Sequence, residues 1–413
     1  MDGLRCGAVW PIILGQIRQR LWLRKDGMTE IDDLIQPMTQ LRRDIHAHPE
    51  LAFSEQRTAA MIAGELRALG LDVHEGVGRT GVVGVLRNGS SKRSIGLRAD
   101  MDALPIDEQT GLPWSSTVPG SFHGCGYDGH VAMLLGAAHH LARHRGFDGT
   151  VNFIFQPAEE GHGGAREMVA EGLFDRFPCD RIFALHNWPD LPAGTIATRA
   201  GPIMGAADWF DIHLEGRGGH AAIPQDTPDA ILAAAHLVTQ LHGIVSRRIA
   251  PVASAVLSVT RIQGGHTHNV LPDRVSIKGT VRSFDPAVQD RIETEMRRVA
   301  QGVAMASGLT ATVDYRRNYP ATINDAEAAS EALKAAATVG TALTAPDPAL
   351  TAEDFAFMLQ ACKGAYIWLG QGRPEGSPPL HNPHYDFNDD VLGIGIGLHV
   401  ALVRQWLGGD AAR

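Results

Sequence analysis

The spacing of apolar residues changes character twice along this chain, and this change limits the possible folds more than any other feature. Up to about residue 203, apolar positions at helical spacing alternate with short apolar runs such as TVNFIFQ (150–156), which are typical of buried strands. Further on, strands such as ADWFDIHLEGR (207–217) alternate apolar with polar residues, as half-exposed antiparallel strands do. After about residue 320 the first pattern returns. We therefore expect an α/β domain in two pieces, interrupted by an α+β domain.

The individual elements follow from the same spacing. Helices are expected where apolar residues recur every three to four positions, and strands where they alternate or run together over a short stretch. The expected helices are 30–48, 54–69, 129–145, 227–247, 286–307, 326–339, 352–361 and 391–407. The expected strands are 82–86, 94–100, 150–156, 181–187, 207–217, 254–264 and 274–284. In an α/β sheet, ligands gather at the strand ends.

These elements predict the domain boundaries. The expected fold class is α/β, with a mixed-sheet catalytic domain built from residues 28–203 and 319–413 and an inserted domain at 204–318. Residues 1–27 are expected to form an N-terminal extension outside the fold. Its apolar run, Ala8 to Gly15, is too short to span a membrane and is followed by no small-residue cleavage site, so neither a membrane anchor nor a signal peptide is expected.

The composition excludes several classes of partner. Hydrophobic residues make up 44% and charged residues 20% of the 413, as in a globular protein with a large core. The net charge is −9 and no basic run occurs, which argues against nucleic acid. The 4 cysteines lie far apart with no CxxC pair, which favours free thiols in a reducing compartment. We expect a cytoplasmic protein with no membrane or nucleic-acid partner.

Paired carboxylates follow the apolar run in FQPAEEG (155–161). Glu159 and Glu160 stand side by side where this buried strand ends. In a metal hydrolase, one such carboxylate binds the cation while its neighbour takes a proton from the attacking water. Taken alone, two glutamates after a strand are more often a solvated turn, so the interpretation depends on other segments.

The segment HGCGYDGH (123–130) supplies that context. It places Cys125 among glycines, with His123, Asp128 and His130 nearby and a predicted helix directly after. Taken alone, it could equally be a glycine-rich turn with a buried cysteine. Two other segments add histidines: His186 in ALHNWPD (184–190) and His381 in LHNPHYDFND (380–389), although each alone is more often a core residue. Thiolate, imidazole and carboxylate together are the ligands of zinc, manganese, nickel or cobalt, so the four segments predict a metal site.

Taken together, the motifs resemble those of the aminoacylase-type metal amidohydrolases, and within them the hippurate hydrolase and indoleacetyl-amino-acid hydrolase branch. The resemblance covers about residues 30–407 in unchanged order. The motifs are LRADMDALPI (97–106), HGCGYDGHVAMLLGAA (123–138), FQPAEEG, LHNWP, GRGGHAAIPQDTPDAI (216–231), THNVLPD (267–273), GTVRSF (279–284), AEDFAF (352–357) and LHNPHYDFND. This resemblance implies a two-metal site, an inserted lid and dimerisation domain, a homo-oligomer, and hydrolysis of N-acyl amino acids or related amides.

The resemblance also implies a role for each residue of the site. Glu159 resembles the general base, and the matching metal ligands are Cys125, Glu160, His186 and His381. His220 resembles a residue that reaches a neighbouring subunit's site and stabilises the oxyanion. Asn269 and Arg282 match positions that hold the carboxylate of a small substrate. The chemistry fits, because guanidinium pairs with carboxylate at two atoms and an imidazole N–H can donate to an oxyanion.

Tyr127 departs from the pattern of the branch, which usually reads CGHD where this chain reads Cys-Gly-Tyr-Asp. The missing histidine would complete the two-metal set, whereas a phenol, with a pKa near 10, binds a divalent cation weakly. Three interpretations stay open. The site holds one firm cation and a second that is weak or absent; Tyr127 binds as phenolate, or His123 substitutes; or the chain is a weakened relative. Tyr127 also counts among the residues expected to contact substrate.

The sequence therefore predicts a hydrolase that cleaves a C–N bond of an N-acyl amino acid-like substrate with Mn, Zn, Co or Ni. The altered ligand set motivates an alternative, an aminohydrolase that releases ammonia from an activated aromatic amine resembling nitroanthranilate. A third possibility, of another class, is a non-catalytic homologue that kept the fold. The retained glutamate pair and His220 favour a working enzyme.

Overall fold

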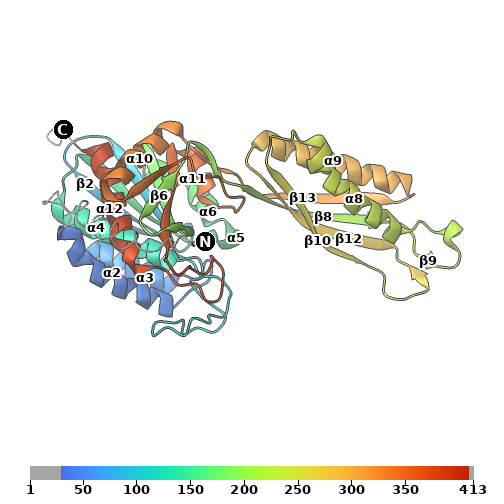
Figure 1. The fold of residues 1–413 in the computed structure, drawn as a ribbon, viewed down its shortest axis with the longest axis horizontal. Helices are drawn as coiled ribbons and strands as arrows, with labels where there is room; N and C mark the ends of the chain where they lie inside the picture. The colour runs from blue at the N-terminus through green and yellow to red at the C-terminus, as the bar shows by residue number, and fades with distance from the viewer. Residues whose placement is uncertain (1–28, 409–413) are drawn as a thin grey trace, which may run out of the picture.

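The computed structural model describes residues 29–408, which form two lobes joined by a narrow connection (Figure 1). The larger lobe contains both ends of the described chain, and the smaller lobe extends away from it. The expected N-terminal extension, residues 1–27, lies outside the described residues.

A mixed sheet forms the centre of the larger lobe, in the strand order β1-β2-β4-β3-β5-β16-β6-β15. The strands are β1 (Asp72–Val77), β2 (Gly81–Asn88), β3 (Ser94–Asp100), β4 (Gly149–Gln156), β5 (Arg181–Pro192), β6 (Thr195–Thr198), β15 (Thr341–Thr344) and β16 (Gly364–Gly372). The central strands β4, β3, β5 and β16 run parallel. The pairs β1–β2, β2–β4 and β6–β16 are antiparallel, and β15 runs parallel to β6 at the edge. The expected mixed-sheet α/β class is confirmed.

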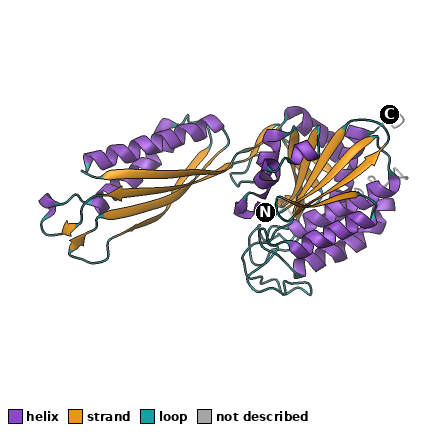
Figure 2. Ribbon diagram, turned by 180° about the vertical axis from the view of Figure 1, so that it is seen from behind, coloured by secondary structure: helices purple, strands orange, loops and turns teal. Residues whose placement is uncertain are grey.

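Long helices cover one face of this sheet and short ones the other (Figure 2). The long helices are α2 (Thr29–Ala47), α3 (Gln56–Ala68), α4 (Tyr127–His144), α10 (Ala326–Val339) and α12 (Leu392–Leu407). The short helices are α5 (Glu159–His162), α6 (Gly164–Ala170), α7 (Leu173–Arg176) and α11 (Phe355–Ala361). One segment of the described chain, Asp389–Leu407, is apolar and long enough to cross a membrane, but 61% of it is buried inside the lobe, as in a core helix.

The smaller lobe is a four-stranded antiparallel sheet with two helices on one face (Figure 2). Its strands are β8 (Ala206–Glu215), β10 (Ala255–Gly264), β12 (Arg274–Ser283) and β13 (Thr310–Tyr319), and its helices are α8 (Ala230–Arg248) and α9 (Pro286–Ala306). A small β9 (Gly219–His220) and β11 (Val270–Leu271) pair at its tip, with a 3-10 turn, η1 (Pro224–Asp226), beside them. Another short pair, β7 (Gly201–Met204) and β14 (Thr322–Asn324), lies at the connection between the lobes.

Candidate metal centre and active site

A cavity of about 390 Å³ lies between the two lobes and gathers most of the residues that the sequence singled out. The larger lobe supplies the strand ends and the loop before α4, and the smaller lobe supplies Ala207, Trp209 and Arg282 from the base of its sheet. The predicted site residues that line this cavity are Cys125, Tyr127, Glu159, Glu160, His186, Arg282 and His381.

Local backbone geometry places these side chains at the ends of regular elements. Glu159 and Glu160 follow β4 through Ala158, whose φ of 54° turns the chain sharply after the strand. Gly126, with a φ of 86°, precedes the first residue of α4, and a side chain there would collide with Tyr385 and Asn187. Only glycine fits this position, so Cys125 and the start of α4 are held at the edge of the sheet.

Three of the predicted ligands form one group. The donor atoms of Cys125, Glu160 and His381 all lie within 4.8 Å of one another. The imidazole Nε2 of His381 is 3.2 Å from Glu160 Oε1. Thiolate, carboxylate and imidazole are the donors of a borderline divalent cation such as zinc, so these residues fit the metal that the resemblance implies.

His186 lies beside the Cys125 sulfur, outside this group of three. Its Nε2 is 3.6 Å from Cys125 Sγ, close to the separation of about 3.6 Å expected for sulfur and nitrogen on one tetrahedral cation. Its Nδ1 lies 2.7 Å from the carbonyl oxygen of Asn187. Because a carbonyl only accepts, Nδ1 carries the proton and Nε2 offers its lone pair. Burial lowers the pKa of His186 to about 3, which keeps the ring neutral, as a ligand must be.

The position usually held by a ligand histidine contains the phenol of Tyr127. Its hydroxyl donates to Glu159 Oε2 at 2.7 Å, and burial raises its pKa well above the usual value. The phenol is therefore a neutral donor in this structure. His123, the other candidate for this position, does not line the cavity; its buried ring lies 6.3 Å from the ring of His46.

Each oxygen of the Glu159 carboxylate accepts a hydrogen bond. Its Oε1 accepts from the backbone N–H of Asp354 at 3.1 Å, and Oε2 accepts from Tyr127. Burial, together with the charges of Glu353 and Glu160, raises the pKa of Glu159 well above its usual range. A carboxyl group of raised pKa in a cavity is suited to taking and returning a proton near neutral pH.

The sequence reasoning missed several residues that organise this site. The carboxylate of Asp102 accepts from the backbone N–H groups of Glu159 and Glu160 at 2.8 and 3.0 Å, which fixes the paired glutamates after β4. The signal was present in LRADMDALPI, because Asp102 follows the buried strand β3 closely, just as the glutamates follow β4.

A second missed group anchors the ligand loop. His130 Nδ1 bonds to the Asp100 carboxylate, and the backbone N–H of Asn187 donates to His130 Nε2 at 3.0 Å. The Asn187 side chain in turn donates to the carbonyl of Cys125 at 2.6 Å. Such outer contacts orient metal ligands, so this chain of bonds ties Cys125 to β3 and to the strand that carries His186.

Arg282 enters the cavity from β12 of the smaller lobe. Its guanidinium donates to Thr280 Oγ1 and to the carbonyl of Val281, and no carboxylate within residues 29–408 forms an ion pair with it. Burial lowers its pKa, and the charge of Asp208 only partly offsets this effect. A guanidinium facing a cavity without an acidic partner is suited to bind a substrate carboxylate.

His220 and Asn269 are not brought into the cavity of their own chain. They lie at the tip of the smaller lobe, where His220 pairs with Val270 and Asn269 accepts from the backbone N–H of Ala221 at 3.0 Å. The His220 side chain is exposed. The two residues are thus close to each other and separate from the glutamates and their metal ligands.

Comparison with known proteins places this site in a family. The family model for peptidase family M20/M25/M40 matches residues 96–405. The chain belongs to this family. The resemblance to the amidohydrolase branch of this family is confirmed. The chain is therefore an M20 hydrolase.

Individual M20 relatives match along almost the whole chain. Hippurate hydrolase of Campylobacter jejuni is 39% identical over 381 residues, covering 92% of this chain and 98% of its own. Thermostable carboxypeptidase 1 of Saccharolobus solfataricus is 39% identical over 389 residues, with the same coverage. Among solved structures, the YXEP protein of Bacillus subtilis, described as a dinuclear metal-binding peptidase from the M20 family, matches with a TM-score of 0.80 and 34% identity over 90% of this chain and 98% of its own.

Proposed function

We propose that this M20 hydrolase cleaves the amide C–N bond of N-acyl amino acid-like substrates that carry a carboxylate. The observation that carries the proposal is the cavity itself, in which Glu159 stands beside the group formed by Cys125, Glu160 and His381 while Arg282 faces in from the smaller lobe. The base, the ligand group and the unpaired guanidinium thus share one space of a size suited to a small substrate.

The cation ligands, Glu159 and Arg282 have separate roles in the proposed reaction. A divalent cation held by Cys125, Glu160 and His381, with His186 beside the same thiolate, would polarise the amide carbonyl and make water more acidic. Glu159 takes a proton from the attacking water and returns it to the leaving nitrogen, which its raised pKa favours. Arg282 binds the substrate carboxylate and so orients the amide against Glu159.

One firmly bound cation per chain, Mn, Zn, Co or Ni, is part of the proposal. The supporting observation is that the candidate ligands are unequally distributed between the two metal positions. Three donors meet in the Cys125 group, whereas the usual histidine position holds the neutral hydroxyl of Tyr127, already bonded to Glu159. A neutral phenol adds little affinity for a divalent cation, so a second cation would be weak or absent.

His220 and Asn269 act in this proposal from a second copy of the chain. Both sit on the far tip of the smaller lobe, which could reach a neighbouring subunit's cavity in a homo-oligomer. There, His220 would donate to the oxyanion and Asn269 to the substrate carboxylate. We further propose a cytoplasmic location; the three cysteines within residues 29–408 are free thiols, which suits a reducing compartment.

A second candidate function uses the same cavity. Trp188, Trp209, Tyr319 and Tyr366 give it an aromatic wall, and Tyr127 alters its ligand set. Both features suit an aminohydrolase that attacks an aromatic carbon bearing an amino group and releases ammonia.

One assay separates the two functions. The metal-loaded protein is given N-acyl amino acids with aromatic and aliphatic acyl groups and, separately, nitro-substituted aminobenzoates, and released amino acid and ammonia are measured independently. Free amino acid from the first set supports amide hydrolysis. Ammonia from the second set alone would replace it with the aminohydrolase, and no product from either would leave only the non-catalytic homologue.

A further inference from the structure

The contact between Tyr127 and Glu159 lies in the cavity, next to the ligand group. Tyr127 is the first residue of α4, and Glu159 follows the end of β4. The ring of Tyr127 is 2% exposed and lies against two imidazoles, with ring centroids 5.3 Å from His130 and 5.8 Å from His186. Both histidines are anchored by Asn187, so the phenol stands between fixed neighbours.

The hydroxyl of Tyr127 is the one side-chain donor that reaches the Glu159 carboxylate within residues 29–408. The other oxygen of this carboxylate accepts from a backbone N–H, that of Asp354. Each carboxylate oxygen has two lone pairs, so one bond at each oxygen leaves one lone pair free on either side. The two donors therefore fix the plane of the carboxylate without blocking its use as a base.

We infer that Tyr127 is a positioning residue for Glu159, and that its hydroxyl sets the orientation of the base at the corner of the cavity where the related branch carries a ligand histidine. The phenol binds the proton acceptor and takes no part in holding the cation. The inference rests on the proposed role of Glu159 and adds to it a residue at the position where this chain departs from the branch.

The substitution Tyr127→Phe tests this role, because it removes the hydroxyl and keeps the ring between His130 and His186. The expected result is a fall in kcat of about 10- to 100-fold, as for the loss of a hydrogen bond to a charged group, with KM changed by less than about threefold and metal per chain unchanged. A kcat within about twofold of the wild-type value overturns the inference, and so does a loss of bound metal, which would make Tyr127 a ligand.

The matched control is Tyr315→Phe. Tyr315 also donates to a carboxylate, that of Asp208, at 2.7 Å, but it lies in the smaller lobe and does not line the cavity. This variant should keep kcat, the quantity compared, because the charge of Asp208 acts on Arg282 and not on Glu159. The comparison shows whether the fall in kcat is specific to the bond with Glu159 or follows the loss of any hydrogen bond between a tyrosine and a carboxylate.

A second measurement needs neither turnover nor a folded Tyr127→Phe protein. The chain has 5 tyrosines, so labelling their Cζ atoms with ¹³C gives a small set of resonances that report hydrogen bonding. Replacing Glu159 by Ala in the metal-free protein should shift the resonance of Tyr127. An unchanged spectrum overturns the inference. Failure of the wild type to cleave any C–N substrate would instead overturn the proposed function, and the spectrum would still decide the contact.

Discussion

The backbone N–H of Asp354 donates a hydrogen bond to Oε1 of Glu159 at 3.1 Å, across 195 residues of sequence. The two residues come from opposite sides of the inserted segment, since Glu159 follows β4 and Asp354 precedes α11. The orientation of the candidate base therefore depends on both pieces of the larger lobe, and the glutamate cannot be placed from its own motif alone.

Replacing Glu159 by Gln should remove turnover and leave the fold and the metal content intact. The amide keeps the shape: its oxygen can accept from the backbone N–H of Asp354 while its NH₂ group donates to the Tyr127 hydroxyl. It cannot shuttle a proton, a role worth about 10²–10⁴-fold. Steady-state kinetics and metal analysis on the same sample check this. Retention of more than about a tenth of the wild-type kcat would show that another group is the base.

Replacing Arg282 by Ala should weaken the binding of substrates that bear a carboxylate far more than the binding of their ester or amide analogues. Loss of a charge-assisted hydrogen bond costs on the order of 1.5–3 kcal/mol, which appears as a higher KM for the acids only. Arg316→Ala is the control, because that arginine is half exposed and pairs with Asp211 at 2.8 Å. Equal losses for acids and esters would mean that Arg282 is structural.

Replacing Tyr127 by His should increase the metal bound per chain from about one toward two, because imidazole adds a donor beside Cys125 and His186. Metal quantification after dialysis against a mild chelator checks this. The effect on activity is also informative: an amidase should gain turnover of N-acyl amino acids. Two tightly held cations in the unmodified protein would contradict the one-cation site.

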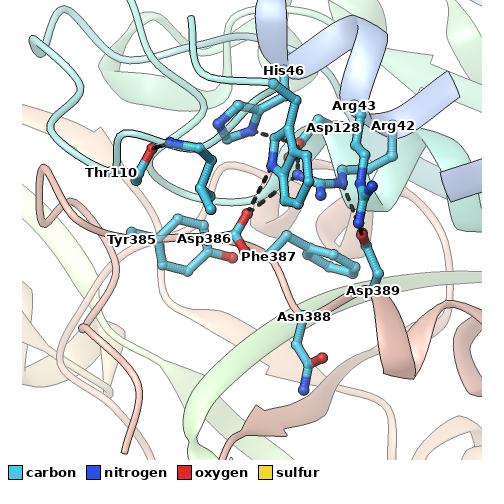
Figure 3. A network of polar contacts seen from close by, with 12 residues as sticks. Arg42, Arg43, His46, Thr110, Asp128, Tyr385, Asp386, Phe387, Asn388 and Asp389 are labelled. Atoms are coloured by element: carbon cyan, nitrogen blue, oxygen red, sulfur yellow. Dashed lines mark hydrogen bonds and ion pairs between the residues drawn. The ribbon is translucent and has the colours of Figure 1, made fainter. Parts of the chain in front are cut away.

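A buried ionic network ties α2 to the loops that carry the site, and it predicts how stability depends on pH (Figure 3). His46 Nδ1 is 2.8 Å from Asp128 Oδ2, and His46 Nε2 is 3.4 Å from Glu108 Oε1. The guanidinium of Arg42 lies between Asp128 and Asp389. Since both ring nitrogens of His46 face carboxylate oxygens, the ring is doubly protonated.

The stability that this network supplies should be lost at alkaline pH. Burial alone would lower the pKa of His46, but the charge and hydrogen bond of Asp128 outweigh it and raise this pKa to about 9. Because its pKa is higher in the folded state, protonated His46 stabilises the fold. This contribution is complete below the unfolded-state pKa of about 6.5 and is lost as pH rises through about 9. A shift of this size corresponds to about 3 kcal/mol.

The variant His46→Gln isolates this contribution. Its melting temperature should lie well below that of the wild type at pH 6 and approach the wild-type value above pH 9, as followed by circular dichroism. A difference between the two proteins that stays constant from pH 6 to pH 10 would show that His46 contributes by packing and not by charge.

Much of this fold could be predicted from the sequence because its signals are local. The helix expected at 391–407 and the strand expected at 94–100 match α12 and β3 almost residue for residue. The helix expected from 129 begins at Tyr127, directly after Gly126, and the one expected from 352 begins at Phe355. The position of Glu159 at the end of a strand could be predicted for the same reason, because the apolar run before it marks the strand.

Other features depend on contacts between distant segments. β13 was not predicted, because TATVDYRRNY carries mostly polar residues and is a strand through its pairing with β8. The fully buried Arg98 pairs with Asp100 and with Glu353, 255 residues away. His220 could be matched to a motif, but its position relative to Glu159 depends on how lobes and subunits are arranged.

The central claim is hydrolysis of a C–N bond supported by one firmly held cation per chain. Its most direct test is a titration of the metal-free protein with Mn²⁺ or Zn²⁺ while hydrolysis of an N-acyl amino acid is measured. The account predicts no turnover without metal and a rate that rises linearly and saturates near one equivalent per chain. Turnover in the metal-free protein, or saturation only near two equivalents, would contradict it.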